Sequence, residues 1–257
     1  MTNEKRCILA GICKEAGKPD VCNNRCASYV AMSGSSGKGG RLASANIPSD
    51  YALTTLKSSP TRVSQSEEYK ALEAYKKTFM RAFEADSEPI KNVYIYSNTP
   101  GNGKTTTACA ILSEWIITQY VGALQHELQP AQQPGYFVEV NTLQQLHKRM
   151  YSPGSQAKKD EAGDTFNRMM DRAKSAPFLV CDDIGVRAAS PSFMSELYDL
   201  VNYRISNGLP TVYTSNKTLE ELGQLFIAED PEMKVINRIS HRCVKLHFDG
   251  ATKRGLR

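Results

Sequence analysis

No stretch of this 257-residue sequence approaches 18 consecutive apolar residues, so a transmembrane helix is excluded. The apolar run near the N-terminus is far too short for a secretory signal peptide. We therefore expect a cytoplasmic protein whose thiols stay reduced. Its seven cysteines, an odd number, argue against a disulfide framework. The sequence contains no internal repeat, no RNP-like aromatic motif and no clear helix-turn-helix pattern, so nothing in it indicates sequence-specific nucleic-acid readout.

The residues that are present have the composition of an ordinary folded protein. Hydrophobic residues make up 40% of the chain and charged residues 23%, which excludes a highly charged disordered chain. The length permits one large domain, or one medium domain with a small appendage, and a sizeable core. The formal net charge of +5 weakly favours a polyanionic partner.

Four of the cysteines, Cys7, Cys13, Cys22 and Cys26, fall within the first 26 residues. A segment this short has too few apolar residues for a core of its own, which predicts stabilisation by a metal ion. Zn²⁺ prefers four soft ligands in a tetrahedron, and no histidine precedes His126, so all four sulfurs would be needed. The spacing C-x5-C-x8-C-x3-C has no tight C-x2-C pair, and four free thiols are the alternative. The other three cysteines are expected to pack as small hydrophobic residues.

Small and flexible residues dominate the segment that follows the cysteines, MSGSSGKGGRLASANIP. This composition is typical of a mobile linker. The sequence therefore predicts a four-cysteine zinc-binding module at residues 1–31, a flexible linker at 32–48 and one larger domain at 49–257.

Short apolar runs alternate with segments of helical periodicity in the larger domain. Strands are expected at 92–97, 136–140, 178–182, 211–214 and 244–248. Helices are expected at 66–85, 105–121, 142–151, 164–174, 193–206, 219–226 and 232–241. Such alternation predicts an α/β fold in which helices cover both faces of a parallel sheet. Residues 125–135, rich in Gln and Pro, are expected to form an exposed loop.

A glycine-rich segment, NTPGNGKTT at 98–106, lies between the first expected strand and the next helix. Gly103, Lys104 and Thr105 match the end of the phosphate-loop pattern G-x-x-x-x-G-K-[ST]. Asn98 replaces the first glycine, a mild departure because Asn adopts the left-handed backbone region at low cost.

The chemistry of nucleotide binding explains these residue types. Glycines let backbone N–H groups point at phosphate oxygens, while Lys104 supplies a positive charge and Thr105 a hydroxyl for Mg²⁺. A Gly-rich surface hairpin is the alternative, and the strand–loop–helix context disfavours it. The predicted nucleotide-binding residues are Asn98, Pro100, Gly101, Asn102, Gly103, Lys104, Thr105 and Thr106.

Acidic and amide side chains follow two later strands. Asp182 and Asp183 end the third expected strand, where Asp182 would organise Mg²⁺ and Asp183 would orient the attacking water of a nucleoside triphosphatase. Asn216 ends the fourth, where it could contact the γ-phosphate or that water. A capped turn and a strand-terminating Asn are the alternatives.

The order of these motifs resembles that of AAA+ ATPases, with NTPGNGKTT, FLVCDDIG, TSN and the late VINRISHRC in sequence. More narrowly, ANIPSDY, CDDIG with the following LYDLVNYRISNGLPTVYTSN, and NRISHR resemble the replicative-helicase loaders of the DnaC/DnaI type from bacteria and phages. The resemblance covers residues 45–257. It implies a parallel-sheet P-loop AAA+ ATPase domain, preceded here by the small cysteine-bearing module.

The resemblance implies catalytic roles for Lys104, Asp182, Asp183, Asn216, Arg238 and Arg254. Asn216 matches the first sensor, Arg254 the second, and Arg238 an arginine finger that reaches the ATP of a neighbouring subunit. Such a finger contributes about 10³–10⁵ in rate. Asp183 stands where many AAA+ proteins carry Glu, which predicts slow or partner-gated hydrolysis. For both arginines, a solvated basic surface is the alternative.

Ligands and partners are also implied: ATP, Mg²⁺, Zn²⁺, a hexameric replicative DNA helicase, single-stranded DNA and further copies of the chain, with no membrane. Basic residues flank the loop where the resemblance places single-stranded DNA, and Tyr151 is available for base stacking. These residues are Lys148, Arg149, Lys158 and Lys159. Plain surface charge is their alternative.

The expected function is ATP-dependent loading of the replicative helicase onto single-stranded DNA during replication initiation. Two alternatives stay open. One is a transposition helper ATPase of the IstB type, and the other is a non-hydrolysing adaptor that uses nucleotide only as a structural ligand.

Overall fold

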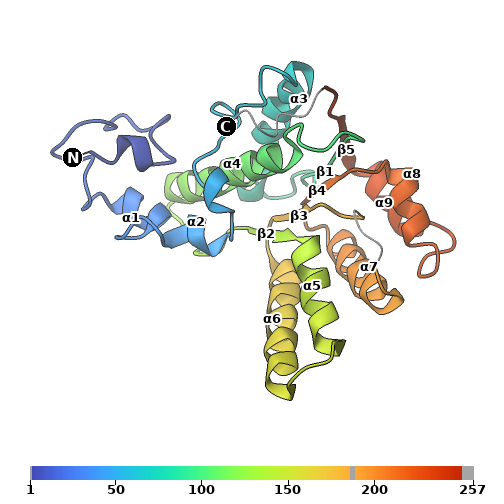
Figure 1. Ribbon diagram of the computed structural model, residues 1–257. Coiled ribbons are helices and arrows are strands. Elements are labelled where there is room, and N and C mark those ends of the chain that lie inside the picture. The colour runs from blue at the N-terminus through green and yellow to red at the C-terminus, as the bar shows by residue number, and fades with distance from the viewer. Residues whose placement is uncertain (1, 186–188, 251–257) are drawn as a thin grey trace.

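The computed structural model of the protein describes residues 2–185 and 189–250. Its centre is a parallel sheet of five strands (Figure 1). The strands are β1 (Asn92–Tyr96), β2 (Tyr136–Glu139), β3 (Leu179–Asp182), β4 (Thr211–Ser215) and β5 (Cys243–His247). They lie in the order β2-β3-β4-β1-β5, so β1 is next to β4 and the chain crosses to the far edge to form β2. The predicted parallel α/β sheet is confirmed.

Helices connect the strands and precede them. They are α1 (Ala27–Ser33), α2 (Gly40–Ser44), α3 (Ser66–Lys77), α4 (Lys104–Gln125), α5 (Val140–Tyr151), α6 (Gln156–Ser175), α7 (Pro191–Ser206), α8 (Leu219–Leu225) and α9 (Lys234–His241). Short 3-10 helices occupy Glu4–Arg6, Ser49–Tyr51 and Thr78–Phe83. Local residues explain two of the helix starts. Ser190 accepts a hydrogen bond from the Phe193 amide before α7, and Thr218 forms a capping box with Glu221 before α8.

The two faces of the sheet bury alternate residues of each strand, as strand geometry requires. Val93 and Ile95 of β1 pack in one core with α3 and α4. Tyr94, between them, packs in the opposite core with residues of α5 to α9. The expectation of helices on both faces is therefore confirmed.

A fully buried arginine, Arg204 of α7, ties the second core together. Its guanidinium donates to Thr211 Oγ1 at 2.8 Å and to the backbone carbonyls of Ala173, Ala176 and Pro210 at 2.8 to 2.9 Å. Burial lowers the pKa of Arg204 to about 10, which leaves it charged at neutral pH. One side chain thus joins the ends of α6 and α7 to the start of β4.

The N-terminal segment, predicted as a separate module and a flexible linker, packs against α4 (Figure 1). Ile8, Leu9 and Met32 belong to the same core as α4, and so does Leu42 of α2, within the segment predicted as a linker. Few apolar residues suffice because they join the core of the larger domain instead of forming one of their own. This also explains why α4 is buried around most of its circumference.

Hydrogen bonds anchor the predicted linker further. Arg41 is buried, lies over the Tyr120 ring at 5.1 Å and donates to the carbonyls of Ala131 and Pro130, each at 2.8 Å. The Phe137 amide of β2 donates to the Ala45 carbonyl at 2.8 Å. Because a single Arg and backbone atoms make these contacts, the Gly- and Ser-rich composition gives no indication of them.

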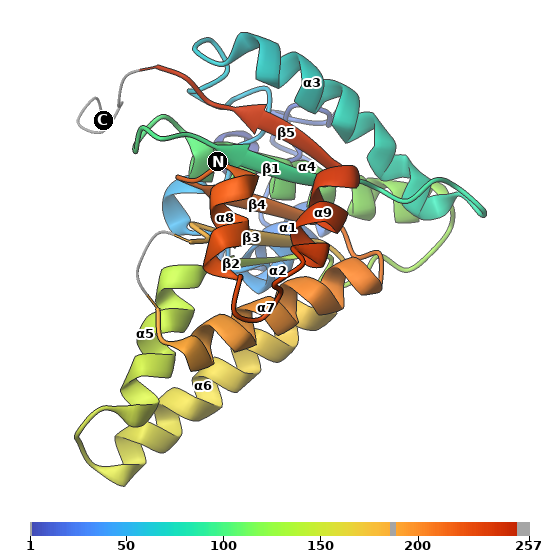
Figure 2. The same cartoon turned by 90° about the vertical axis from the view of Figure 1, so that its right-hand side faces the viewer.

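Helices α5 and α6 pack against each other and extend away from the sheet as an arm (Figure 2). The helix α6 begins eight residues before the predicted residue 164, at Gln156. Its first turns are polar and exposed, so apolar periodicity could not reveal them. Within residues 2–185 and 189–250, no helix is both long and apolar enough to cross a membrane.

Candidate functional site

The phosphate loop connects β1 to α4 at the carboxyl edge of the sheet, and α4 begins at Lys104. Gly101 and Gly103 have φ angles of +81° and +99°, the left-handed region that favours glycine. The sequence alone suggests that Asn98 can replace the first glycine because Asn tolerates left-handed backbone. Asn98 does not have a positive φ, so that explanation does not apply. The predicted strand–loop–helix arrangement is present.

Within the loop, side chains turn inward. Lys104 is 6% exposed and its Nζ donates to the Thr99 carbonyl at 3.3 Å and to Asn102 Oδ1 at 3.4 Å. Asn102 Nδ2 donates to Ser97 Oγ at 2.5 Å and to the Phe248 carbonyl at 2.8 Å. Asn102 therefore holds the loop against the end of β5, a role that its motif position alone does not indicate.

Asp182, at the end of β3, lies directly beside the phosphate loop. Its Oδ2 accepts a hydrogen bond from Thr105 Oγ1 at 3.0 Å, and its Oδ1 accepts one from Thr214 Oγ1 at 2.6 Å. Burial raises its pKa to about 7, and the neighbouring Asp183 charge also raises it, against the lowering effect of the Thr214 hydrogen bond. A buried carboxylate and a hydroxyl from two separate elements thus converge, which is the donor set that Mg²⁺ prefers.

The residues next to this pair come from β3 and β4. Asp183 has a φ of +60°, an unusual conformation for a residue other than glycine, and its amide donates to Thr214 Oγ1 at 2.9 Å. Such strain is typical of functional sites. Asn216 follows β4, and its Oδ1 is buried with no hydrogen-bond partner in the described part of the chain. The sequence predicts no role for Thr214, although Thr214 begins the TSN segment that ends at Asn216.

The two arginines assigned by resemblance are placed differently. Arg238 is exposed on α9 and donates to Asn202 Oδ1 at 3.2 Å and Ser206 Oγ at 3.0 Å, both on α7. These contacts hold it on the surface of its own subunit, facing α7 and not the phosphate loop. Arg254 lies outside the described residues.

The four N-terminal cysteines line one cavity of about 380 Å³, together with apolar residues of α4. Burial raises the pKa of the Cys7 thiol, and interaction with Cys26, Cys13 and Cys22 also raises it. No three His, Cys, Asp or Glu side chains in the described ranges are arranged to hold a metal ion. The four cysteines line the same cavity without forming a metal-binding group among the described residues, so the zinc site stays a prediction. Cys109 and Cys181 are buried and Cys243 is partly buried, as expected for packed residues.

The basic residues predicted to contact DNA lie on the arm. Lys148 and Arg149 are exposed in the last turn of α5, and Lys158 and Lys159 lie in the first turns of α6, next to the acidic pair Asp160 and Glu161. Tyr151 is 70% exposed. It lines a cavity of about 580 Å³ between α5 and the start of α7. The arm therefore presents mixed charge and one exposed aromatic ring.

Comparison with known proteins places this geometry among solved folds. No protein-family model and no curated protein matches the sequence. The structure is similar to DnaI, at 20% identity and a TM-score of 0.52, over 79% of this chain and 95% of that one. It is similar to the DnaC helicase loader at 20% identity and a TM-score of 0.52, over 79% and 100%. A Streptococcus pyogenes serotype M3 protein described as a primosome component matches at 20% identity and a TM-score of 0.53, over 81% and 92%.

At this identity the comparisons establish the fold, and they agree with the resemblance inferred from the motifs. The chain has the fold of the DnaC/DnaI-type helicase loaders, with a phosphate loop and a strand-end aspartate in contact at the carboxyl edge of its sheet.

Proposed function

We propose that the chain is an ATPase of the DnaC/DnaI type that loads a hexameric replicative DNA helicase onto single-stranded DNA. The single observation that carries the ATPase assignment is the 3.0 Å contact between Thr105 of the phosphate loop and Asp182 of β3. The loader fold supplies the context for this contact.

Each residue of the site has a defined task in this proposal. Lys104 and the loop amides bind phosphate oxygens, and the hydroxyl of Thr105 and the carboxylate of Asp182 hold Mg²⁺, whose charge offsets that of the phosphates. Asp183 accepts a hydrogen bond from the attacking water and orients it. The amide of Asn216, beside them, binds the γ-phosphate or the same water.

Turnover of ATP separates an enzyme from an adaptor. We expect single-stranded DNA to stimulate hydrolysis by the wild-type chain, and Asp183→Asn to remove most of that turnover while ATP still binds. Asp86→Asn, which changes an exposed acid before β1 and away from the phosphate loop, serves as the control. Equal rates for the wild type and Asp183→Asn would favour the non-hydrolysing adaptor.

The arm of α5 and α6 is the proposed contact for single-stranded DNA. Exposed Lys148, Arg149 and Lys158 can follow a phosphate backbone, and the ring of Tyr151 can stack on a base. Binding to a labelled single-stranded oligonucleotide, measured by fluorescence anisotropy, should weaken in Lys148→Ala/Arg149→Ala. Preference for duplex DNA and a transposase would instead favour the transposition helper.

The cysteine-bearing segment is the proposed grip on the helicase, stabilised by Zn²⁺. Its support is that all four cysteines line one cavity, since thiolates are the ligands that Zn²⁺ prefers in structural sites. We expect co-purification of the helicase to be lost in Cys22→Ser/Cys26→Ser and kept in Cys243→Ser. Metal analysis of the purified chain should find about one equivalent of zinc. If the double variant still binds the helicase, the contact lies in the ATPase domain instead.

Self-assembly is the remaining part of the proposal. Exposed Arg238 lies near Asn202 and Ser206 of its own subunit, and we propose that it leaves them to meet the ATP of a neighbouring copy. Hydrolysis would then rise with protein concentration, as the subunits assemble.

A further inference from the structure

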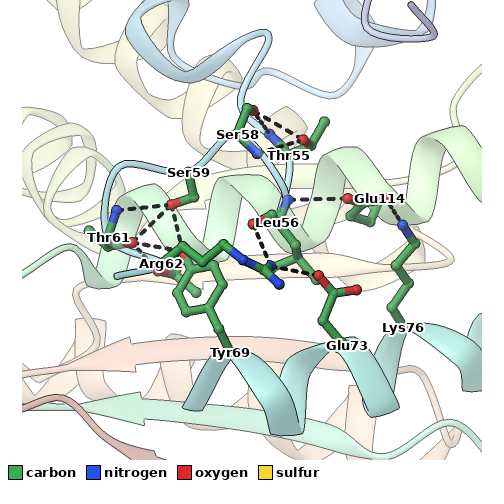
Figure 3. A network of polar contacts seen from close by, with 11 residues as sticks. Thr55, Leu56, Ser58, Ser59, Thr61, Arg62, Tyr69, Glu73, Lys76 and Glu114 are labelled. Carbon is green, nitrogen blue, oxygen red and sulfur yellow. Dashed lines mark hydrogen bonds and ion pairs between the residues drawn. The ribbon is translucent and has the colours of Figure 1, made fainter. Parts of the chain in front are cut away.

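A group of buried hydroxyls joins the loop before α3 to α3 and α4, and Figure 3 shows Ser59, Thr61 and Tyr69 of this group. We call Ser59, Thr61, Tyr69 and Thr107 the hydroxyl cluster. Thr61 Oγ1 lies 2.9 Å from Ser59 Oγ, 2.7 Å from Tyr69 Oη and 3.1 Å from Thr107 Oγ1. Tyr69 Oη donates to Ser59 Oγ at 2.5 Å and lies 2.9 Å from Thr107 Oγ1. The cluster joins the loop before α3, α3 itself and the first turn of α4.

The methyl group of Thr61 packs on Gly103, the last glycine of the phosphate loop. A Cβ atom built on Gly103 would lie only 2.0 Å from Thr61 Cγ2 and 2.9 Å from Thr61 Cβ. Any side chain at Gly103 would therefore collide with Thr61. The contact is possible only because residue 103 is glycine. Thr61 therefore limits the conformations that the backbone at residue 103 can adopt.

The hydroxyl cluster fixes the direction of that methyl group. Thr61 has few staggered side-chain rotamers, and each of them places Oγ1 and Cγ2 differently. The side chain is 3% exposed, so its hydroxyl has no access to bulk water and depends on the cluster for hydrogen bonds. The rotamer that brings Oγ1 to Tyr69 and Thr107 is the one that presses Cγ2 against Gly103.

Further hydrogen bonds hold the same loop and the phosphate loop to one point of the sheet. Gln65 Nε2 donates to the Asp249 carbonyl at 2.6 Å, and Asn102 Nδ2 donates to the adjacent Phe248 carbonyl at 2.8 Å. The two loops thus share an anchor at the end of β5 as well as the contact between Thr61 and Gly103.

Two further sets of contacts hold this loop to α3 and α4 (Figure 3). Arg62 pairs with Glu73 at 2.7 Å, and the buried Glu114 accepts a hydrogen bond from the Leu56 amide at 3.1 Å and pairs with Lys76 at 2.6 Å. Arg62 also lies over the Tyr69 ring at 5.9 Å, so the matched control is the pair of Lys76 with Glu114, which joins α3 to α4 without a residue of the hydroxyl cluster.

We propose that Thr61 and Tyr69 are positioning residues for the nucleotide. They hold Gly103 in its left-handed conformation and thereby aim the amides at the start of α4 toward bound phosphate. The inference rests on the proposed ATPase function, and it adds residues that lie outside the phosphate-loop motif, more than 30 positions before Gly103 in the sequence.

The test compares nucleotide binding by isothermal titration calorimetry in Thr61→Val, Tyr69→Phe, Thr61→Ser and the control Lys76→Gln. Thr61→Val and Tyr69→Phe each remove one hydroxyl of the cluster. We expect their Kd for ATP and for ADP, and their KM, to rise about tenfold, or about 1.4 kcal/mol. Their kcat should stay within about twofold of the wild type, because the reacting groups are untouched. Thr61→Ser keeps the hydroxyl but removes the methyl group that packs on Gly103, so its Kd should rise as well.

Each titration is made well below the unfolding temperature of its variant, which thermal unfolding without nucleotide determines. Unchanged Kd values in both Thr61→Val and Tyr69→Phe would overturn the inference while leaving the ATPase proposal intact. An equal loss of affinity in Lys76→Gln would also overturn it, because general loosening of the loop would then explain the effect. A wild-type chain that binds no nucleotide would overturn the proposed ATPase function and this inference together.

Discussion

Replacing Arg204 with Met tests whether one buried side chain joins α6, α7 and β4. The guanidinium has no carboxylate partner among the described residues. It donates hydrogen bonds to the Thr211 hydroxyl and to the carbonyls of Ala173, Ala176 and Pro210. Met has a similar length but no donor, so these buried acceptors would lose a charged hydrogen-bond donor. Each unsatisfied buried group costs about 1–3 kcal/mol.

Two effects limit the sum of these costs. The Pro210 carbonyl keeps a hydrogen bond from the Leu179 amide at 3.2 Å, and the substitution also removes the cost of burying a charge. We therefore expect Arg204→Met to lower the free energy of unfolding by about 3 kcal/mol, and Arg204→Lys by about 2 kcal/mol, because Lys cannot reach all of the acceptors.

Urea unfolding followed by circular dichroism measures both values from the midpoint and the slope. Arg168→Met is the control, since this exposed arginine of α6 should change stability by less than about 0.5 kcal/mol. A loss below about 1 kcal/mol for Arg204→Met would refute the reasoning and show that the acceptors find other partners.

Three further predictions concern other parts of the molecule. Burial raises the pKa of Asp182 from its ordinary value of 3.8 to about 7. At a pH between these two values, the folded chain keeps Asp182 protonated, whereas the unfolded chain does not. Without Mg²⁺, its contribution should therefore reduce stability by about 2 kcal/mol as pH rises from 5 to 7, a dependence that urea unfolding should find missing in Asp182→Asn. Arg238→Ala should lower ATP turnover by about 10³ in assembled protein and leave unfolding unchanged; equal turnover would assign Arg238 to the α7 surface alone. Arg41→Ala should free the segment around α2 from α4, so limited proteolysis should cleave near residue 41 sooner than in the wild type, and identical cleavage would contradict the anchoring role.

Much of the larger domain follows from local patterns in the sequence. The strand at Asn92–Tyr96 and the helix after it are predictable within a few residues, because apolar runs and the glycine-rich turn between them are local features. The meeting of Thr105 with Asp182 is also expected, since both follow from motifs at the carboxyl ends of parallel strands. Sheet order is not predictable in this way, because pairing of β1 with β4 depends on contacts between distant segments.

The N-terminal segment shows what local patterns miss. Glycine and serine around α2 indicate a flexible linker, yet buried Arg41 and Leu42 hold it to the larger domain through distant partners. The positions of Thr61 and Tyr69 beside Gly103 are equally non-local, and no motif marks them. Composition reports on a chain segment alone, while burial depends on the surface that the rest of the chain offers it.

Helicase loading is the central claim, and transfer of a purified hexameric replicative helicase to circular single-stranded DNA tests it most directly. A circle has no free end, so the ring must be opened or assembled around the strand. We predict that the helicase elutes with the DNA in gel filtration only when the wild-type chain and ATP are both present, and that Lys104→Ala abolishes the transfer. Equal transfer without the chain, or with Lys104→Ala in its place, would contradict the account.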